Sequence, residues 1–243
     1  MIGFFKVILY QPLLNLLVFF YNVIPGHNLG VAIILLTLVI KIILLPFSLQ
    51  SVKAQKSFKE LQPKLNEIKE KYANQKEKQA QAMLSLYKEH KVSPFSSCLP
   101  LLIQLPVLIV VFQVFRVGLT DASLPIYSFL FNPGILNITA FGFLNLSQAS
   151  PFLAFVTAVL QYWQMQALST KQVDKKMVLE KGAKDENMMA MMNKQMKFMM
   201  PILTFFIGFT MPSGLMLYWL VSLLFSVGEQ KIIFNYSQKI NHS

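Results

Sequence analysis

Long apolar segments alternate with lysine-rich segments along the chain. After the N-terminal 27 residues, the first apolar segment runs from Leu29 to Pro46 and contains one charged residue, Lys41. Four more apolar segments follow. Most of them are close to the length of about 20 residues that a helix needs to cross a bilayer, and the fourth of the five is shorter. The pattern predicts an all-α polytopic membrane protein with five transmembrane helices, over residues 28–50, 95–118, 149–169, 196–210 and 213–235.

The composition agrees with a membrane protein. Hydrophobic residues make up 54% of the 243 residues, including 21 phenylalanines, which is more than a soluble core of this size would hold. Cys98 is the only cysteine, which excludes an internal disulfide and a cysteine metal cluster. The three histidines are scattered and are interpreted as surface residues, so neither a metal nor a cofactor is expected.

Lysines indicate the orientation of the predicted helices. Residues 51–93 carry ten lysines and residues 170–195 carry six, whereas residues 119–148 have no lysine or arginine. Basic residues accumulate in short cytoplasmic loops. We therefore place the two lysine-rich segments and the tail, residues 236–243, in the cytoplasm, and the loop of residues 119–148 outside. The first predicted helix then begins on the outer side.

Two interpretations fit residues 1–27. The segment is apolar enough to span a bilayer, but Tyr10-Gln11-Pro12 interrupts it. We favour an amphipathic helix in the outer interface, and a signal anchor is the alternative. Both leave the first of the five helices in the same orientation.

The lysine-rich segment 51–93 is predicted to form a cytoplasmic helical hairpin. Apolar residues recur at helical spacing in each arm, with a turn near Ala73-Asn74 and an end near Ser93-Pro94. The predicted stripes are Leu61, Leu65, Ile68 and Tyr72 in the first arm, and Ala80, Met83, Leu84 and Tyr87 in the second. Such a hairpin either is a solvated charged element without a partner or captures a partner or substrate.

Lys41 is the candidate functional residue. It lies about 13 Å along a helix from Gln50, which is far for a lysine that reaches the interface. A charge inside a bilayer costs several kcal/mol, so it normally faces protein or a water-filled cavity and marks a functional site. A snorkelling lysine without a function is the alternative.

Polar residues at helical spacing accompany Lys41 in three predicted spans. The stripes are Thr37, Lys41 and Ser48; Thr157, Gln161 and Gln164; and Trp219, Ser222 and Ser226. Such residues often only join helices by hydrogen bonds. Around a cation, however, a water-containing polar cavity explains them better, and we expect no carboxylate within a span to pair with Lys41.

The chain lacks the short motifs of hydrolases and nucleotide-driven pumps, such as G-x-S-x-G, H-E-x-x-H and G-x-x-x-x-G-K-[ST]. The expected absence of midplane carboxylates and of an internal repeat also argues against an ion-coupled transporter. We therefore expect a protein that is not an enzyme and that does physical work on another molecule.

Several motifs together resemble the YidC/Oxa family of membrane insertases. They are the stretch Gly30 to Pro46, the Leu61-Gln62-Pro63 segment of the hairpin, the segment Pro94 to Pro106, Met200-Pro201 before the fourth span, and Pro212 to Trp219 at the start of the fifth. The similarity covers nearly the whole chain, in order and in spacing. This chain differs from the family at two positions: it has Lys41 where relatives usually have arginine, and Leu223 where they commonly have asparagine.

The resemblance implies a five-helix core around a hydrophilic groove that opens to the cytoplasm and the lipid and is closed outside. The groove would be lined by Lys41, Thr37, Gln104, Thr157, Gln161, Gln164, Trp219 and Ser222. The residues expected to capture substrates or partners are Leu61, Pro63, Tyr72, Met83, Tyr87, Met192 and Met196. Met192 and Met196 belong to a methionine-rich run at the start of the fourth span. The alternative role of this run is to pack against the fourth helix.

The implied function is insertion of nascent membrane proteins into the plasma membrane of a bacterium. Partners would be these clients and membrane lipid, with no specific nucleic-acid sequence. The Sec translocon, the signal recognition particle pathway and the ribosome are partners that the sequence leaves open. The competing hypotheses are a small-anion transporter or channel that uses Lys41, and a non-translocating assembly scaffold beside Sec.

Overall fold

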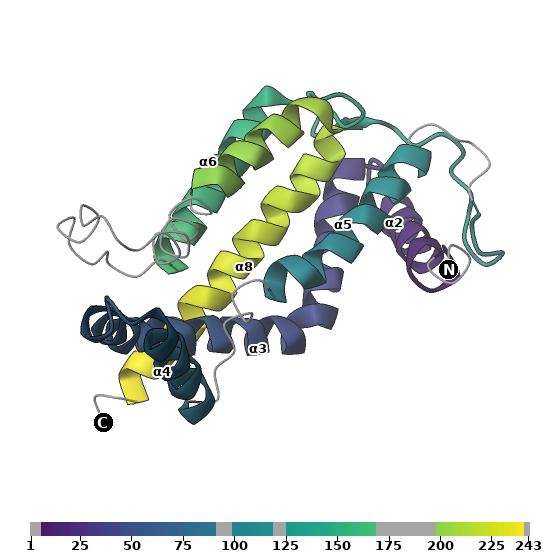
Figure 1. Ribbon diagram of the computed structural model, residues 1–243. Helices are drawn as coiled ribbons and strands as arrows, with labels where there is room; N and C mark the ends of the chain where they lie inside the picture. The colour runs from purple at the N-terminus through teal and green to yellow at the C-terminus, as the bar shows by residue number, and fades with distance from the viewer. Residues whose placement is uncertain (1–5, 91–98, 119–124, 169–197, 241–243) are drawn as a thin grey trace.

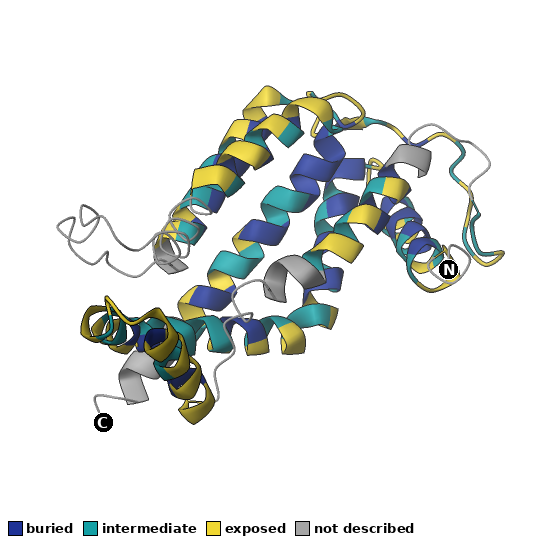
Figure 2. Cartoon of the chain, in the orientation of Figure 1, coloured by how far each residue is buried: buried dark blue, intermediate teal, exposed yellow. Residues whose placement is uncertain are grey.

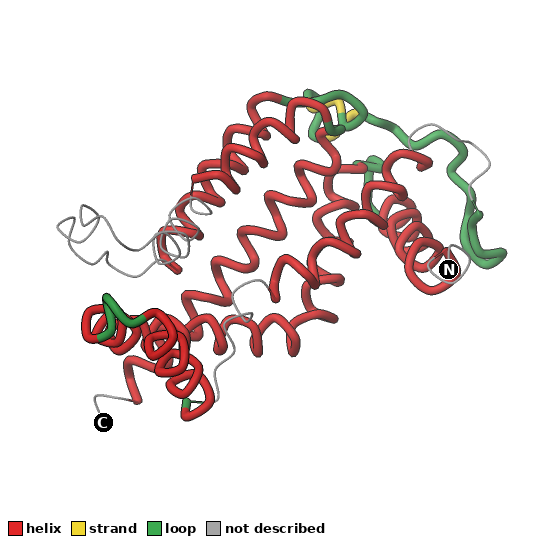
Figure 3. The backbone as a smooth tube through the Cα atoms, in the orientation of Figure 1, coloured by secondary structure: helices red, strands yellow, loops and turns green. Residues whose placement is uncertain are grey.

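Helices form most of the described part of the chain. The computed structural model describes residues 6–90, 99–118, 125–168 and 198–240 (Figure 1). Loops join the helices at the two ends of the molecule (Figure 3). In the described ranges, the strands are β1 (Thr139–Ala140) and β2 (Leu144–Asn145), which pair antiparallel. Cys98, Met192 and Met196 lie outside the described residues, so the role expected of the two methionines stays a prediction.

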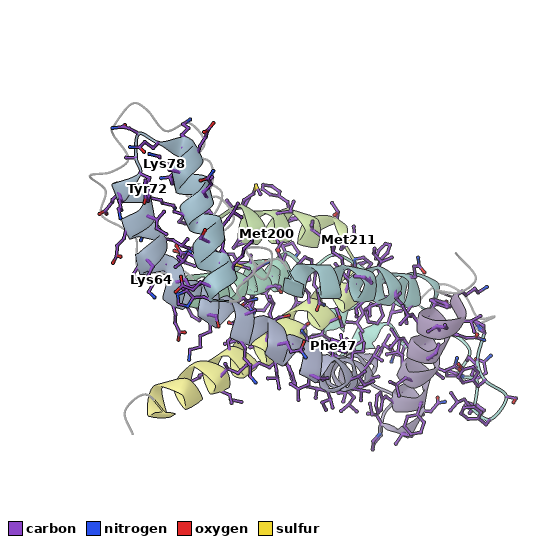
Figure 4. All side chains as sticks on the ribbon, turned by 60° about the horizontal axis from the view of Figure 1, so that its bottom comes forward. Phe47, Lys64, Tyr72, Lys78, Met200 and Met211 are labelled. Atoms are coloured by element: carbon purple, nitrogen blue, oxygen red, sulfur yellow. The ribbon has the colours of Figure 1, made fainter. Side chains whose placement is uncertain are left out.

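The N-terminal helix lies across the direction of the long helices (Figure 4). A short π-helical turn, Lys6–Tyr10, leads into α2, Gln11–Val23. Leu14, Leu17 and Val18 are buried at helical spacing, so α2 has one face in the core. Asn15 fixes this helix to the loop of residues 125–148, which we call the outer loop after its predicted side, because its Oδ1 accepts a hydrogen bond of 2.7 Å from the backbone N–H of Tyr127.

Helix α3, Leu29–Lys71, continues from the first predicted span into the first arm of the predicted hairpin. Asn28 caps its start, where the side-chain Oδ1 accepts from the N–H of Val31 at 3.3 Å. The helix changes direction part-way along (Figure 1), and Pro46 lies in its interior. A proline there removes a backbone hydrogen bond and clashes with the preceding turn, which bends a helix. The segments predicted at residues 28–50 and 51–93 thus share one helix.

Helix α4, Lys76–Glu89, folds back along the end of α3 and completes a hairpin that projects from the other helices (Figure 4). The predicted turn at Ala73-Asn74 is confirmed, since it lies between the two helices. The hairpin has its own small core, formed by Leu61, Leu65, Leu86 and Tyr87, with Phe58, Ile68 and Met83 packed against it.

The buried face of α4 differs from the predicted one. Leu84 is 56% exposed and Ala80 is exposed, whereas Leu86 and Gln79 are buried. The prediction that Ala80 and Leu84 belong to the buried stripe of α4 was wrong. The polar residue Gln79 occupies the buried position closest to the turn between α3 and α4. Gln79 donates from Nε2 to the backbone carbonyl of Lys69 at 3.2 Å, which satisfies a carbonyl in the last turn of α3.

Helix α8, Ser213–Ile240, lies between two groups of helices (Figure 1). Helix α6, Pro151–Leu168, and the helix Phe198–Thr210 lie on one side, and α5, Leu99–Gly118, lies on the other. Gly208 permits close contact of the helix Phe198–Thr210 with α6, because a Cβ at this position would clash with Ala154.

The outer loop covers the ends of α3 and α8 that lie away from the hairpin. At the start of α8, the N–H groups of Ser213 and Gly214 donate to the carbonyls of Gln148 and Leu146 at 2.8 and 3.0 Å. These are the donors that a helix start leaves without an intrahelical partner. At the start of α3, a Cβ on Gly30 would lie 2.6 Å from the Cβ of Ala140, so only glycine allows this contact with β1.

The molecule is apolar both inside and outside. One core joins α2, α3, α5 and α8, while many large apolar side chains face outwards (Figure 2), for example Ile43 at 65% and Phe206 at 64% exposure. Exposed apolar faces of this extent are typical of helices in lipid. Among the described residues, three helical segments are long and apolar enough to span a membrane: Lys6–Val23, Leu29–Lys71 and Ser213–Ile233. An all-α membrane protein fits these observations, and the count of five spans stays a prediction.

Candidate functional site

Lys41 lies where three helices meet. Its side chain is only 8% exposed. The Nζ atom donates to Ser226 Oγ of α8 at 3.1 Å and to Gln104 Oε1 of α5 at 3.5 Å. The predicted groove residues Lys41 and Gln104 are therefore brought together, and Ser226 of the predicted α8 stripe joins them. A snorkelling lysine would point to the interface, whereas this ammonium group is bound by the protein.

The contacts of Lys41 continue into a buried polar cluster. Gln104 donates from Nε2 to the hydroxyl oxygen of Tyr218 at 2.9 Å, and Tyr218 is completely buried. The Tyr218 hydroxyl also bonds with Ser222, one turn further along α8. Gln104 thus links the cation to the tyrosine, and the predicted site residue Ser222 lies at the edge of this cluster. Sequence analysis missed Tyr218 because it reads as an ordinary aromatic residue of a membrane helix.

A carboxylate lies beside Lys41, contrary to the expectation that no acidic residue in a span accompanies it. Glu229 of α8 is 5% exposed, and its Oε2 accepts a hydrogen bond of 2.6 Å from Ser48 Oγ of α3. The two charges interact electrostatically. The sequence does contain a signal for Glu229, because Ser222, Ser226 and Glu229 follow one another at spacings of four and three, on one helical face.

Lys41 and Glu229 occupy successive levels between α3 and α8. At about 1.5 Å per residue, Ser226 lies roughly 20 Å along α8 from Ser213, and Glu229 roughly 24 Å. The carboxylate is therefore nearer than the cation to the end of the bundle that carries the lysine-rich hairpin. Its Oε1 is buried without a hydrogen-bond partner, which is costly for a carboxylate.

The polar residues of α6 form a second patch on the other side of α8. Gln161 is buried and accepts at Oε1 from the Thr204 hydroxyl of the helix Phe198–Thr210, and Gln164 is also buried. Thr157 donates to the carbonyl of Leu153 in its own helix at 2.7 Å. Gln161 thus joins two helices, which is the alternative role that such residues have in membranes.

Thr37 and Trp219, which were also predicted to line the groove, have other contacts. Thr37 is fully buried and donates to the carbonyl of Ile33 at 2.7 Å, so its hydroxyl is satisfied within α3. Trp219 packs against the small apolar core of Leu153, Ala154 and Met216. The lining of one common groove by all the predicted residues therefore stays a prediction.

Comparison with known proteins assigns the family. Residues 19–240 match the family described as 60Kd inner membrane protein. The chain belongs to this family. A protein of Fusobacterium nucleatum named membrane protein insertase YidC is 35% identical over 229 residues, which are 93% of this chain and 96% of the relative. Proteins of the same name from Geobacter metallireducens and Geobacter sulfurreducens are each 32% identical over 234 residues, 96% of this chain but 38% of their own length.

These comparisons confirm the resemblance to YidC-type insertases. The relatives are named membrane protein insertases, which agrees with the expectation of a protein that is not an enzyme. In the part of the chain that the structure describes, no group of three or more histidine, cysteine, aspartate or glutamate residues could hold a metal ion.

The hairpin residues predicted to capture clients differ in accessibility. Leu61 and Tyr87 are buried in the hairpin core, and burial raises the pKa of the Tyr87 hydroxyl above its usual value. Met83 packs at the edge of that core, and Tyr72 is half-buried below the ammonium group of Lys71. Pro63 is exposed. Their packing accounts for the apolar stripes, and capture of a client by this hairpin stays a prediction.

Proposed function

We propose that this chain is a membrane protein insertase of the plasma membrane of a bacterium. Five helices would surround a hydrophilic groove that captures nascent segments from the cytoplasm and releases them laterally into lipid. The observation that carries the proposal is the buried ammonium group of Lys41, bound to Ser226 and Gln104 within an apolar bundle. The family of the chain and the name of its relatives support the same function.

The mechanism follows from the cost of moving polar groups through hydrocarbon. Each unsatisfied backbone group costs several kcal/mol in the bilayer core. A water-containing recess would shorten the apolar distance that the translocated end of a client must cross, and Lys41 would attract its acidic residues. Partition of the client helix into lipid would then drive the rest of the transfer without a nucleotide. The outer loop over α3 and α8 supports a recess that is closed on the outer side.

The lysine distribution supports the proposed topology. The hairpin of α3 and α4 and residues 170–195 would be cytoplasmic, and the outer loop and the start of α3 would be outside. Residues 6–23 would lie in the outer interface. The transverse direction of α2 and its contacts with the outer loop favour this placement (Figure 4), although its length and composition also allow a span.

Insertion in vesicles containing only this protein tests the proposal. The client is a single-spanning protein with a short acidic N-terminal tail, and a version with a neutral tail is the control. Lys41→Ala should lower the insertion of the acidic client about 5- to 30-fold, which corresponds to a loss of about 1 to 2 kcal/mol. Lys41→Arg should retain most of it, since the charge remains. Equal insertion by the wild-type protein and Lys41→Ala would contradict a role for the cation.

A small-anion transporter is the second candidate. The buried carboxylate of Glu229 removes one argument against an ion-coupled transporter, because intramembrane carboxylates often couple ion movement, but its negative charge would weaken the binding of an anion at Lys41. Uptake of a small anion by the same vesicles, without insertion of either client, would establish the transporter. Insertion without uptake would support the insertase.

A further inference from the structure

Two polar contacts join α3 to α8, and they carry opposite charges. At one level, Lys41 Nζ donates to Ser226 Oγ at 3.1 Å. At the next, Ser48 Oγ donates to Glu229 Oε2 at 2.6 Å. Residues 41 and 48 are two turns apart on α3, and residues 226 and 229 are about one turn apart on α8. The cation and the carboxylate are therefore both held by serines, in the same interface between the same two helices.

The carboxylate changes the charge of the site. With Lys41 alone, the buried cluster would carry one formal positive charge, and an ionised Glu229 would cancel it. Opposite charges near each other in a low-dielectric interior attract strongly, and this attraction offsets part of the cost of burying both. Among the described residues, Glu229 Oε1 has no hydrogen-bond partner in the protein, and Lys41 is the cation with which the carboxylate interacts electrostatically.

We propose that Glu229 is the internal counter-ion of Lys41 and determines which clients the site accepts. An acidic group of a client competes with Glu229 for the field of Lys41. Coming from the end with the lysine-rich hairpin, it also passes the carboxylate before it reaches the cation, and like charges repel. Clients with a weakly acidic tail are disfavoured, and those with several acidic residues are accepted. The inference rests on the insertase function proposed above.

A cysteine at the site measures this effect without any client. The probe is Ser226→Cys in a protein in which Cys98, the only native cysteine, is replaced by serine. We compare its labelling rates with an anionic and a cationic methanethiosulfonate of similar size, in detergent and in vesicles. Glu229→Gln keeps an oxygen that accepts from Ser48 and removes the charge. It should raise the ratio of anionic to cationic labelling about fivefold, as a change of about 1 kcal/mol does.

The control for labelling is Glu77→Gln, because Glu77 is an exposed acid of α4 and its removal changes the net charge of the protein equally. This variant should leave the ratio unchanged. An unchanged ratio in Glu229→Gln would overturn the proposal. A cysteine that reacts with neither reagent would also overturn it, since an acidic client must reach the same place through water. Neither result depends on the insertion assay.

Insertion of clients with one or three acidic residues in the tail then tests selectivity. Glu229→Gln should raise insertion of the client with one acidic residue about fivefold and change that of the other much less. The effect should vanish when Lys41 is already replaced by glutamine, because Glu229 acts through Lys41. A purely structural role of Glu229 would instead lower insertion of both clients in both backgrounds. If vesicles with the wild-type protein insert no client while the labelling ratio responds as expected, the proposed insertase function is rejected. The proposal that Glu229 is the counter-ion of Lys41 is then retained.

Discussion

Tyr218 shows how one side chain holds the polar cluster in place. It is completely buried, and its hydroxyl oxygen accepts from Gln104, which in turn accepts from Lys41. A buried donor that loses its acceptor costs more than the hydrogen bond itself contributes, because water cannot replace the partner. The position of the ammonium group therefore depends on a residue that does not touch it.

Replacing Tyr218 by phenylalanine should destabilise the protein by about 1 to 3 kcal/mol, since the Gln104 amide is left without its acceptor. Thermal unfolding in detergent measures the loss. In a protein that already carries Gln104→Leu, the same change should cost less, because no amide remains to be satisfied. Equal costs in both backgrounds would show that the hydrogen bond between the two residues does not stabilise the fold.

Sequence analysis located part of this cluster and could not locate the rest. Lys41 was evident because a charge in an apolar run is rare, and Ser222 was evident from helical spacing. Glu229 was missed although it continues that spacing and lies within the span predicted over residues 213–235, because Gln230 and Lys231 beside it give this part of the helix the composition of a membrane boundary. The separate pairing of Gln161 with Thr204 depends on how α6 packs against its neighbour, which the periodicity of one helix does not specify.

At the scale of elements, the hairpin shows the limits of an apolar stripe. Both arms and the turn were predicted correctly, but the buried face of α4 is centred on Leu86 rather than Leu84. α4 carries a leucine on each of two faces, and the face that is buried is the one that also contains Gln79, which contacts the end of α3. A hydrogen bond across the turn is a tertiary feature, so it is not visible in the pattern of either arm.

The same substitution at the two leucines of α4 distinguishes these faces. Leu86→Ala removes buried methyl groups and should weaken packing of the hairpin by about 2 to 5 kcal/mol. Leu84→Ala, the matched control on the exposed face, should change it by less than about 0.5 kcal/mol. Hydrogen exchange of the amides of residues 61–87 in the intact protein reports both. Faster exchange in Leu84→Ala than in Leu86→Ala would indicate the face that the sequence pattern predicted.

At the scale of the whole molecule, charge and apolar surface are separated along one direction. The lysine-rich hairpin projects from one end, and the outer loop covers the other (Figures 1 and 4). Between them, exposed apolar side chains such as Ile43 and Phe206 suit contact with lipid. The residues of the N-terminal helix fit both a span and an interfacial position.

Single cysteines in the Cys98→Ser background decide the topology. Asn132→Cys in the outer loop should react with a membrane-impermeant maleimide added to spheroplasts, whose plasma membrane is intact. Lys78→Cys in the hairpin should react only after lysis. Both positions are exposed, so a lack of reaction reports the membrane and not burial. Lys6→Cys is the informative third position, because it lies at the described start of the N-terminal helix. An interfacial helix puts it outside with Asn132. A signal anchor puts Lys6→Cys inside with Lys78. In that case α2 would have to change from its transverse direction to one that crosses the bilayer.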